Sequence, residues 1–288
     1  MALNNCDEKQ KSLILVDGAT GYLGNHLVSR LKGNGWRVRC LFRKNSSKQD
    51  VEFLSSLTDD LMEIDFSILD EQKAARIFDS VTHLVHLIGS IAPKRGETLT
   101  ELHENYTDKM VSYSIENKLQ KIIHVTALGA GPDARSNYHR TKWKAEEVVI
   151  KSGLDYTILR PSLIIGREAG FRDSKLVKRL LNFILKKAYV PLINGGRNKV
   201  QPIYVGDAAA AIEAALSEGA GKIFDLGGPE PVEMRELVER LASHLDKKVK
   251  ILPLNAYLGF LVAGCMEAIQ EVPTLSSDQV VLSLTDNI

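Results

Sequence analysis

The chain has 288 residues, and its 37 Lys and Arg residues against 36 Asp and Glu residues give a formal charge of +1. With 44% hydrophobic and 25% charged residues, the composition is typical of a soluble globular protein and excludes a collagen-like or disordered chain. No charge-free run reaches the roughly 20 residues that a membrane-spanning helix needs, so a transmembrane protein is not expected.

The cysteines and the N-terminal segment predict a location. Cys6, Cys40 and Cys265 are too few and too far apart for a disulfide framework or a cysteine-built zinc site, which favours a reducing compartment. The polar N-terminal segment lacks the apolar core of a secretory signal. The sequence therefore predicts a cytoplasmic protein.

Charge is distributed unevenly along the chain. Residues 18–49 and 174–206 each contain seven Lys or Arg residues and no acidic residue, whereas residues 251–288 contain four acidic residues and no Lys or Arg. The near-zero total therefore hides two basic regions and one acidic region, each of which can face a different partner.

Strands and helices alternate through the first half of the chain. The apolar run 12–17 predicts a short buried strand, and the apolar spacing over 22–31 predicts a helix. The same patterns predict strands at 36–42, 61–65, 81–88, 121–125 and 156–159, and helices opened by Ser67, over 99–111 and over 137–152. Such alternation implies parallel strands joined by helical crossovers. The predicted fold class is α/β, a Rossmann-type doubly wound parallel sheet.

The pattern is less regular after Pro161. Helices are predicted over 176–184 and 232–245, and strands over 200–205 and 222–226. We therefore predict an NAD(P)-binding core at 12–165 and a smaller C-terminal substrate-side extension at 166–288, with the chain returning to the core near 200–228. The apolar stretch 254–266 is predicted to be a core helix; an exposed position would instead indicate association with another molecule.

A glycine-rich turn follows the first predicted strand and precedes a helix. Its glycines lack the Cβ atoms that would keep a pyrophosphate away from the backbone amides and from the positive end of the helix. The order of strand, glycine triplet and helix predicts dinucleotide binding. The predicted contacts in this turn are Gly18, Thr20, Gly21, Tyr22, Leu23 and Gly24.

Charge at the end of the second predicted strand favours NADP(H) over NAD(H). A protein that prefers NAD places a carboxylate about 20 residues after the glycines, where it binds the ribose 2′-hydroxyl. Arg43 and Lys44 occupy that region here, and a guanidinium can hold a 2′-phosphate through charge-assisted hydrogen bonds. The alternative is a solvated strand end that is rich in basic residues.

Tyr138 and Lys142 are candidates for acid–base catalysis. They lie four residues apart at the start of a predicted helix, so they share one helix face. A nearby ammonium lowers the pKa of a phenol from its usual value of about 10. Such a pair can exchange the proton that accompanies hydride transfer at a carbonyl or carbinol carbon.

Several motifs resemble the short-chain dehydrogenase/reductase superfamily, in its extended or atypical branches. The resemblance rests on the Gly-x-x-Gly-x-x-Gly spacing, Asp65-Phe66, Leu159-Arg-Pro-Ser162 and Gln201-Pro-Ile-Tyr-Val-Gly-Asp207. Leu87-Ile88-Gly89 departs from the superfamily's usual Asn-Ala-Gly. Together with segments 124–130 and 277–288, it is most similar to the group that contains the NAD(P)H-binding accessory subunit of respiratory complex I. Epimerase/dehydratase-like proteins are the other resembling group.

The resemblance implies roles for particular residues. Lys142 would also bind the nicotinamide ribose, and Thr126 would orient the substrate oxygen. The implied cofactor contacts outside the turn are Asp65, Phe66, Leu87, Ile88, Gly89, Lys142, Pro161 and Ser162. Two functions stay open: an NADP(H)-dependent oxidoreductase or epimerase that uses Tyr138, Lys142 and Thr126, and a non-catalytic NAD(P)H-binding accessory or assembly protein of a respiratory or redox complex.

Other ligands and partners are predicted more broadly. No metal is expected, because the histidines lack metal-ligand spacing, and no nucleic-acid partner is predicted. His124 is predicted to be a hydrogen-bonded core residue and His139 to be solvent-exposed. The basic stretch 174–206 has three interpretations: a funnel for an anionic small-molecule substrate, a contact face for an acidic partner or phospholipid headgroups, or an ordinary amphipathic helix. A monomer or homodimer is predicted, and contact with a protein complex or with a membrane surface stays open.

Overall fold

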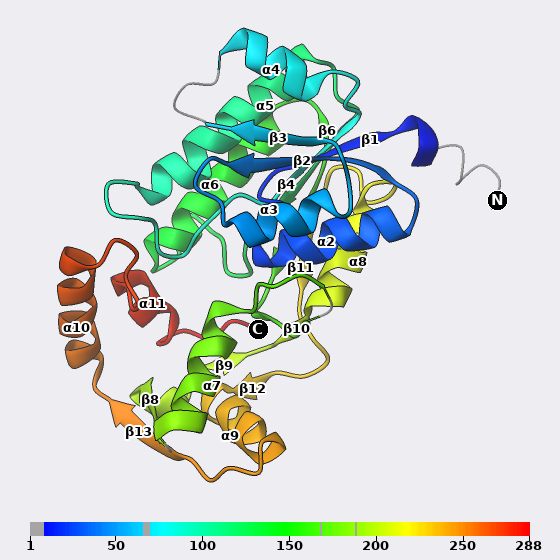
Figure 1. Ribbon diagram of the computed structural model, residues 1–288. Helices are drawn as coiled ribbons and strands as arrows, with labels where there is room; N and C mark the ends of the chain where they lie inside the picture. Colours follow the sequence, from blue (N-terminus) through cyan, green and yellow to red (C-terminus); the bar gives the residue numbers. More distant parts are fainter. Residues whose placement is uncertain (1–8, 66–69, 168, 188) are drawn as a thin grey trace.

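The computed structural model describes residues 9–65, 70–167, 169–187 and 189–288, and its centre is a seven-stranded sheet (Figure 1). The strand order is β11-β6-β5-β4-β1-β2-β3, and every neighbouring pair is parallel. The strands are β1 (Leu13–Val16), β2 (Arg37–Arg43), β3 (Leu61–Ile64), β4 (His83–His86), β5 (Lys121–Val125), β6 (Asp155–Pro161) and β11 (Lys222–Leu226). The predicted doubly wound parallel sheet is confirmed.

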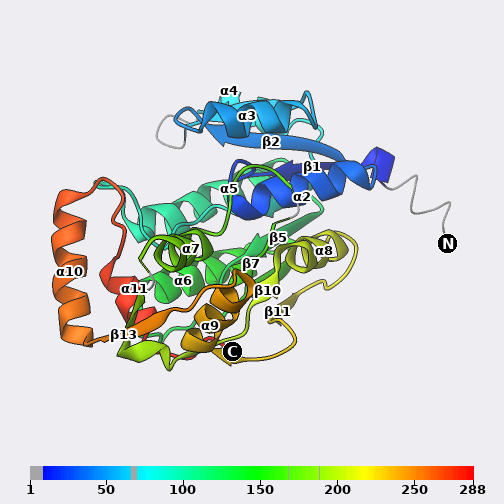
Figure 2. The same cartoon turned by 60° about the horizontal axis from the view of Figure 1, so that its bottom comes forward.

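Helices cover both faces of this sheet. One face packs against α2 (Tyr22–Gly33), α3 (Lys48–Ser55) and α8 (Val205–Ala215), and the other packs against α4 (Glu71–Phe78), α5 (Tyr106–Glu116) and α6 (Asn137–Lys151). Figure 2 shows the two layers from a second side. Strands that are buried on both faces explain the continuous apolar runs in the sequence; all four residues of β1 are buried.

Before Pro161, three predicted elements differ from the observed ones. β4 ends at His86 rather than at residue 88, because the next two backbone N–H groups donate to the Asp17 carboxylate instead of to a strand. α4 begins after Asp70, whose carboxylate accepts the Lys73 N–H, and Ser67 lies outside the described residues. The helix predicted over 99–111 begins as a π-helical turn, η1 (Glu101–Asn105), before α5.

The C-terminal part forms a smaller layer below the strand ends. Its apolar centre includes residues of α7 (Lys175–Lys187), β8 (Tyr189–Ile193) and α9 (Met234–His244). The chain re-enters the main sheet through α8 and β11. The remaining elements are β7 (Ile164–Ile165), η2 (Asn194–Gly196), β9 (Lys199–Val200), β10 (Ile203–Tyr204), β12 (Val232–Glu233), β13 (Lys250–Leu254) and α11 (Ser277–Leu282).

Helix α10 (Ala256–Ile269) lies at the edge of the molecule beside α11 (Figures 1 and 2). The prediction of a core helix over 254–266 is wrong: Tyr257 is 86% exposed, Leu261 is 66% exposed, and only Gly259 and Ala263 are buried. Because α10 is apolar on every face, its sequence carries no signal for which face is buried. Within the described ranges, no helix is long and apolar enough to span a membrane.

Candidate dinucleotide-binding site

The glycine turn lies between the end of β1 and the first turn of α2, beside the end of β4. Gly18 has φ +63°, which favours glycine, and a Cβ on it would lie 3.2 Å from the Leu87 Cβ. A Cβ on Gly24 would lie 2.3 Å from the Gly18 carbonyl oxygen. The turn therefore packs too tightly for other residues, and it leaves the N-terminus of α2 open to an anion. No side chain caps that N-terminus, so its amides suit a pyrophosphate.

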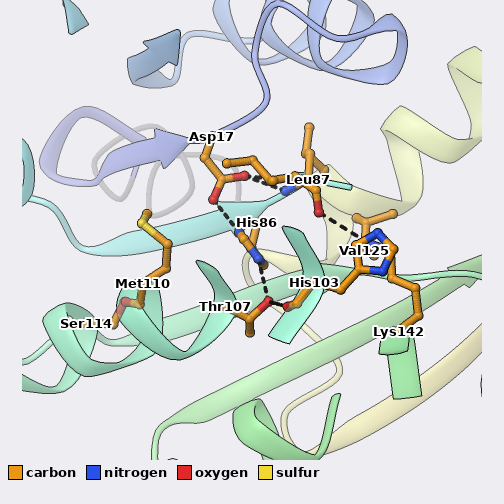
Figure 3. Close-up of polar contacts among 10 residues, drawn as sticks. Asp17, His86, Leu87, His103, Thr107, Met110, Ser114, Val125 and Lys142 are labelled. Atoms are coloured by element: carbon orange, nitrogen blue, oxygen red, sulfur yellow. Dashed lines mark hydrogen bonds and ion pairs between the residues drawn. The ribbon is translucent and has the colours of Figure 1, made fainter. Parts of the chain in front are cut away.

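Asp17 connects the turn to the end of β4 (Figure 3). One carboxylate oxygen accepts the Leu87 N–H at 2.7 Å and the Ile88 N–H at 3.1 Å, and the other pairs with the His86 ring. Asp17 is fully buried. Sequence reasoning assigned roles to Leu87 and Ile88 and missed Asp17; a carboxylate at the end of an otherwise apolar strand was the available signal.

The end of β2 closes on the glycine turn. The Thr20 and Ser46 hydroxyls lie 3.3 Å apart, and the Arg43 N–H donates to the Ser46 hydroxyl. Arg43 and Lys44 are exposed, and the Arg43 guanidinium is 3.5 Å from the Glu97 carboxylate. Basic groups thus lie where the adenosine ribose of a dinucleotide is expected. The Glu97 carboxylate would compete with a phosphate for Arg43.

Three further residues that are predicted to contact the cofactor, Tyr22, Leu23 and Asp65, lie in environments that differ from one another. The Tyr22 hydroxyl donates to the Gly166 carbonyl oxygen at 2.6 Å, and burial raises its pKa to about 12. Leu23 packs against the core of the α2 face. Asp65 is exposed directly after β3, whereas Phe66 lies outside the described residues.

Tyr138 does not have the electrostatic environment that its spacing from Lys142 predicts. Burial raises the pKa of the Tyr138 phenol to about 12, whereas a nearby ammonium was expected to lower it. The reason is that the Lys142 ammonium is directed at the sheet, where it donates to the Ile88 carbonyl at 3.2 Å and the Val125 carbonyl at 3.4 Å.

Lys142 is itself buried beside an accessible glycine. It is 3% exposed, and burial lowers its pKa to about 8, although the charges of Asp17 and Glu146 oppose that shift. A Cβ on Gly89 would lie 2.5 Å from the Lys142 Nζ atom, so glycine makes room for the ammonium there. Gly89 is exposed, and the lysine therefore lies just beneath the protein surface at this point.

The Thr126 hydroxyl is used in a buried network. It donates to Glu146 at 2.6 Å, and the two oxygens of Glu146 also accept from Arg160 at 2.9 and 2.5 Å. Orientation of a substrate oxygen by Thr126 stays a prediction, and its hydroxyl proton is used in the hydrogen bond to Glu146. Sequence reasoning missed Glu146 and Arg160; Glu146 lies four residues after Lys142 on the same helix.

The C-terminal residues close one side of the site. The Ser162 hydroxyl donates to Asn287, whose side-chain amide donates to the Leu128 carbonyl at 2.8 Å. The Asp278 carboxylate accepts the Asn137 N–H at 2.7 Å, at the start of α6. Pro161, the last residue of β6, is buried. Pro161 and Ser162 therefore lie at the carboxyl end of β6, and their contact with a cofactor stays a prediction.

A cavity of about 330 Å³ lies beside the start of α6. Its lining includes Ile91, Arg95, Leu99, Asn137, Glu267 and Asp278. The two carboxylates accept backbone N–H groups from Asn137 and Ser277. This mixture of one cation, two anions and apolar walls does not resemble a basic funnel.

The histidines differ from their predicted environments. His124 is buried, but neither of its ring nitrogens has a hydrogen-bond partner. His139 is partly buried against Gly129 and packs on Tyr138 with ring centroids 5.3 Å apart, so the prediction of a solvent-exposed ring is wrong. Burial lowers the pKa of His139 to about 4. Across the described residues, no group of three or more His, Cys, Asp or Glu side chains could hold a metal.

The second basic stretch includes an amphipathic helix. Leu180 and Ile184 of α7 are buried in the C-terminal core, while its lysines face outward. Burial lowers the pKa of Lys175, and the neighbouring Arg172 and Arg179 lower it further. Three cations therefore lie at the start of α7, and one of them, Arg172, is paired with Asp50 at 2.7 Å. That this region binds an anionic ligand stays a prediction.

Comparisons with known proteins agree with this architecture. The model of the NAD dependent epimerase/dehydratase family matches residues 14–227. The structure of DesIV, a dTDP-glucose 4,6-dehydratase from Streptomyces venezuelae with NAD and TYD bound, superimposes with a TM-score of 0.72 at 20% identity, over 84% of each chain. At that identity the likeness shows the fold alone. The resemblance found in the sequence is confirmed at the level of the superfamily.

The names of two relatives give a location. NADH dehydrogenase (ubiquinone) 1 alpha subcomplex subunit 9, mitochondrial, of Arabidopsis thaliana is 33% identical over 88% of this chain, which spans 62% of the relative's length. The mitochondrial NADH-ubiquinone oxidoreductase 40 kDa subunit of Neurospora crassa is 26% identical over 95% of this chain and 71% of its own. The cytoplasmic prediction is wrong in view of these mitochondrial relatives. Scattered cysteines cannot distinguish one reducing compartment from another.

Proposed function

The chain belongs to the NAD dependent epimerase/dehydratase family, and we propose that it binds NADP(H) as a component of a mitochondrial NADH dehydrogenase assembly. The family binds a nicotinamide cofactor, and the finer choice of NADP(H) rests on the end of β2. Arg43, Lys44 and the hydroxyls of Thr20 and Ser46 are the groups that would hold a 2′-phosphate. No carboxylate takes the position that NAD-preferring proteins use.

One observation carries the accessory role: α10 exposes an apolar surface. Tyr257, Leu261 and Ile269 are 86%, 66% and 78% exposed, on a helix that has no Lys or Arg. Exposed apolar patches of this kind mark contact with another protein or a membrane. The absence of basic residues over 251–288 disfavours an anionic lipid surface, and the names of the two relatives favour a protein complex.

Cofactor choice is tested by titrating the full chain with NADPH and NADH. Arg43→Ala is expected to weaken NADPH binding by roughly tenfold to a hundredfold, because hydrogen bonds to a charged group contribute about 1.5–3 kcal/mol. Binding of NADH should change little. Arg37→Ala, at the other end of β2, is the matched control and should leave both affinities unchanged. Equal affinity of the unmodified chain for NADH and NADPH would contradict the preference.

Assembly is tested by native gel electrophoresis of mitochondria that express the tagged chain. The unmodified chain is expected to migrate with respiratory complex I, and Leu261→Asp on α10 should migrate free. Leu185→Asp is the matched control, since Leu185 is 56% exposed on α7; it should still migrate with the complex. If Leu261→Asp also stays with the complex, α10 is not the contact face.

A catalytic oxidoreductase or epimerase is the second candidate. It is favoured by Tyr138 and Lys142 lying on α6 beside the cavity at Asn137. The raised pKa of Tyr138 and the use of the Thr126 hydroxyl by Glu146 oppose it. Carbonyl substrates incubated with NADPH test this candidate: turnover that is lost in Tyr138→Phe would support it, and turnover that survives would exclude Tyr138 as the acid–base group.

A further inference from the structure

A buried row of polar groups connects the glycine turn to η1 through the last residue of β4 (Figure 3). The His86 Nδ1 atom pairs with Asp17, and the His86 Nε2 atom lies 2.8 Å from the Thr107 hydroxyl. The Thr107 hydroxyl lies 2.5 Å from the His103 carbonyl oxygen. All of these groups are at most 1% exposed, so bulk solvent does not satisfy their hydrogen bonds.

Counting protons along this row determines the state of His86. A hydroxyl and a carbonyl oxygen at 2.5 Å need a hydrogen between them, and a carbonyl has none to give. Thr107 therefore donates to His103, and the His86 Nε2 atom must carry a hydrogen to bond the Thr107 oxygen. A second hydrogen lies between the His86 Nδ1 atom and Asp17. His86 and Asp17 together thus carry no net charge.

This pairing leaves Lys142 without an anion of its own. Asp17 is neutralised by His86, and Glu146 is neutralised by Arg160. The Lys142 ammonium bonds only carbonyl oxygens in the described part of the chain. Other titratable groups nearby are neutral: burial lowers the pKa of His103 to about 2 and that of His124 well below its usual value, and it raises that of Tyr138 to about 12.

The excess positive charge lies on the nicotinamide side of the proposed site. Dinucleotides bind across the point where the strand order reverses, which is between β1 and β4 here. The end of β2, with Arg43, lies on the side expected for the adenosine half. The nicotinamide half therefore extends over the ends of β4 and β5, where Gly89 is exposed directly above the Lys142 ammonium.

From this charge count we infer that the site binds reduced NADPH more tightly than oxidised NADP⁺. The two forms have nearly the same shape, but the oxidised nicotinamide ring carries one additional positive charge. A buried cation repels that charge through a medium of low polarity. The inference rests on the proposed dinucleotide binding and adds a preference for one oxidation state of the ligand.

Calorimetric titration of the full chain with NADPH and with NADP⁺ tests the preference. The reduced form is expected to bind at least roughly tenfold more tightly; a tenfold difference also raises the midpoint potential of the bound couple by about 30 mV. Equal affinities would overturn the inference and leave the proposed function intact. Failure of both forms to bind would instead overturn the proposed function.

Three variants separate charge from shape. His86→Gln removes the ring that shares a hydrogen with Asp17, so the free carboxylate compensates Lys142 and the affinity ratio should fall towards one. Asp17→Asn breaks the same pair, but it leaves His86 neutral and Lys142 uncompensated, so the ratio should stay high even if both affinities fall. Adding Asp17→Asn to His86→Gln should restore the ratio.

The ratio is insensitive to a purely structural defect, because both ligands occupy the same site. A ratio that is unchanged in His86→Gln would show that His86 does not neutralise Asp17. A ratio that falls equally in Asp17→Asn would show that the charge of the Asp17 carboxylate does not control the ratio. Either result overturns the inference.

Discussion

Two regions depart in opposite ways from the usual burial of apolar side chains and exposure of charged ones. They are the site at the ends of β1, β4 and β5, and the helix α10. At the strand ends, Asp17, His86 and Lys142 are buried charged or polar groups, each 3% exposed or less. On α10, Tyr257 and Ile269 are apolar and almost fully exposed. Buried charge is costly unless it is paired, and exposed apolar surface is unfavourable unless it is covered. These two exceptions support the partners proposed above: a dinucleotide in the first case and a macromolecule in the second.

The largest expected effect on the buried side is in the network of Glu146. Glu146→Ala leaves the Arg160 guanidinium and the Thr126 hydroxyl without their partner, so we expect a loss of about 3–5 kcal/mol in the free energy of unfolding. Urea unfolding measures this loss. Glu147→Ala is the control, because Glu147 pairs with the exposed Lys151 and with no other described residue, and the change should cost less than about 1 kcal/mol.

The corresponding change on α10 should have almost no effect on stability. Leu261→Ser removes an exposed side chain and should change the free energy of unfolding by less than about 0.5 kcal/mol. A loss comparable with that of Glu146→Ala would mean that α10 is packed in the free chain. The contrast between the two regions would then disappear.

The preference for NADPH over NADP⁺ is expected to weaken as the pH rises. Burial lowers the pKa of Lys142 to about 8 from 10.5, so its charge is present below that pH and lost above it. His103, His124 and Tyr138 stay neutral through this range. The ratio of NADPH to NADP⁺ affinity should therefore fall by roughly tenfold across the titration of Lys142. Titrations on either side of pH 8 measure it, and a constant ratio would argue against Lys142 as the discriminating charge.

A small gain in stability is expected at Gly264 on α10. A Cβ at this position would meet no atom within 4 Å, so Gly264→Ala should stabilise the free chain by about 0.5–1 kcal/mol through helix propensity alone. Thermal unfolding of the isolated protein measures this gain. Destabilisation would show that the outer face of α10 is already in contact with another part of the chain.

Particular residues show how far local patterns extend. The glycine turn, the end of β2 at Arg43 and the strand alternation depend on neighbours within a few residues, and periodicity reports such neighbours well. The environment of Tyr138, in contrast, does not depend on near neighbours in the chain. Spacing alone placed Lys142 on the same helix face, but the ammonium is directed by the Ile88 and Val125 carbonyls, which come from strands distant in the chain.

The sequence by itself determined the doubly wound sheet, the glycine turn and the basic end of β2, because each is encoded by short-range order of apolar, glycine and charged residues. Only the tertiary structure decided that Thr126 donates to Glu146, that Asp17 pairs with His86, and that α10 is exposed. Hydrogen bonds between side chains of different strands depend on geometry that no local pattern contains. The burial of a helix that is apolar on all sides depends on which other elements reach it.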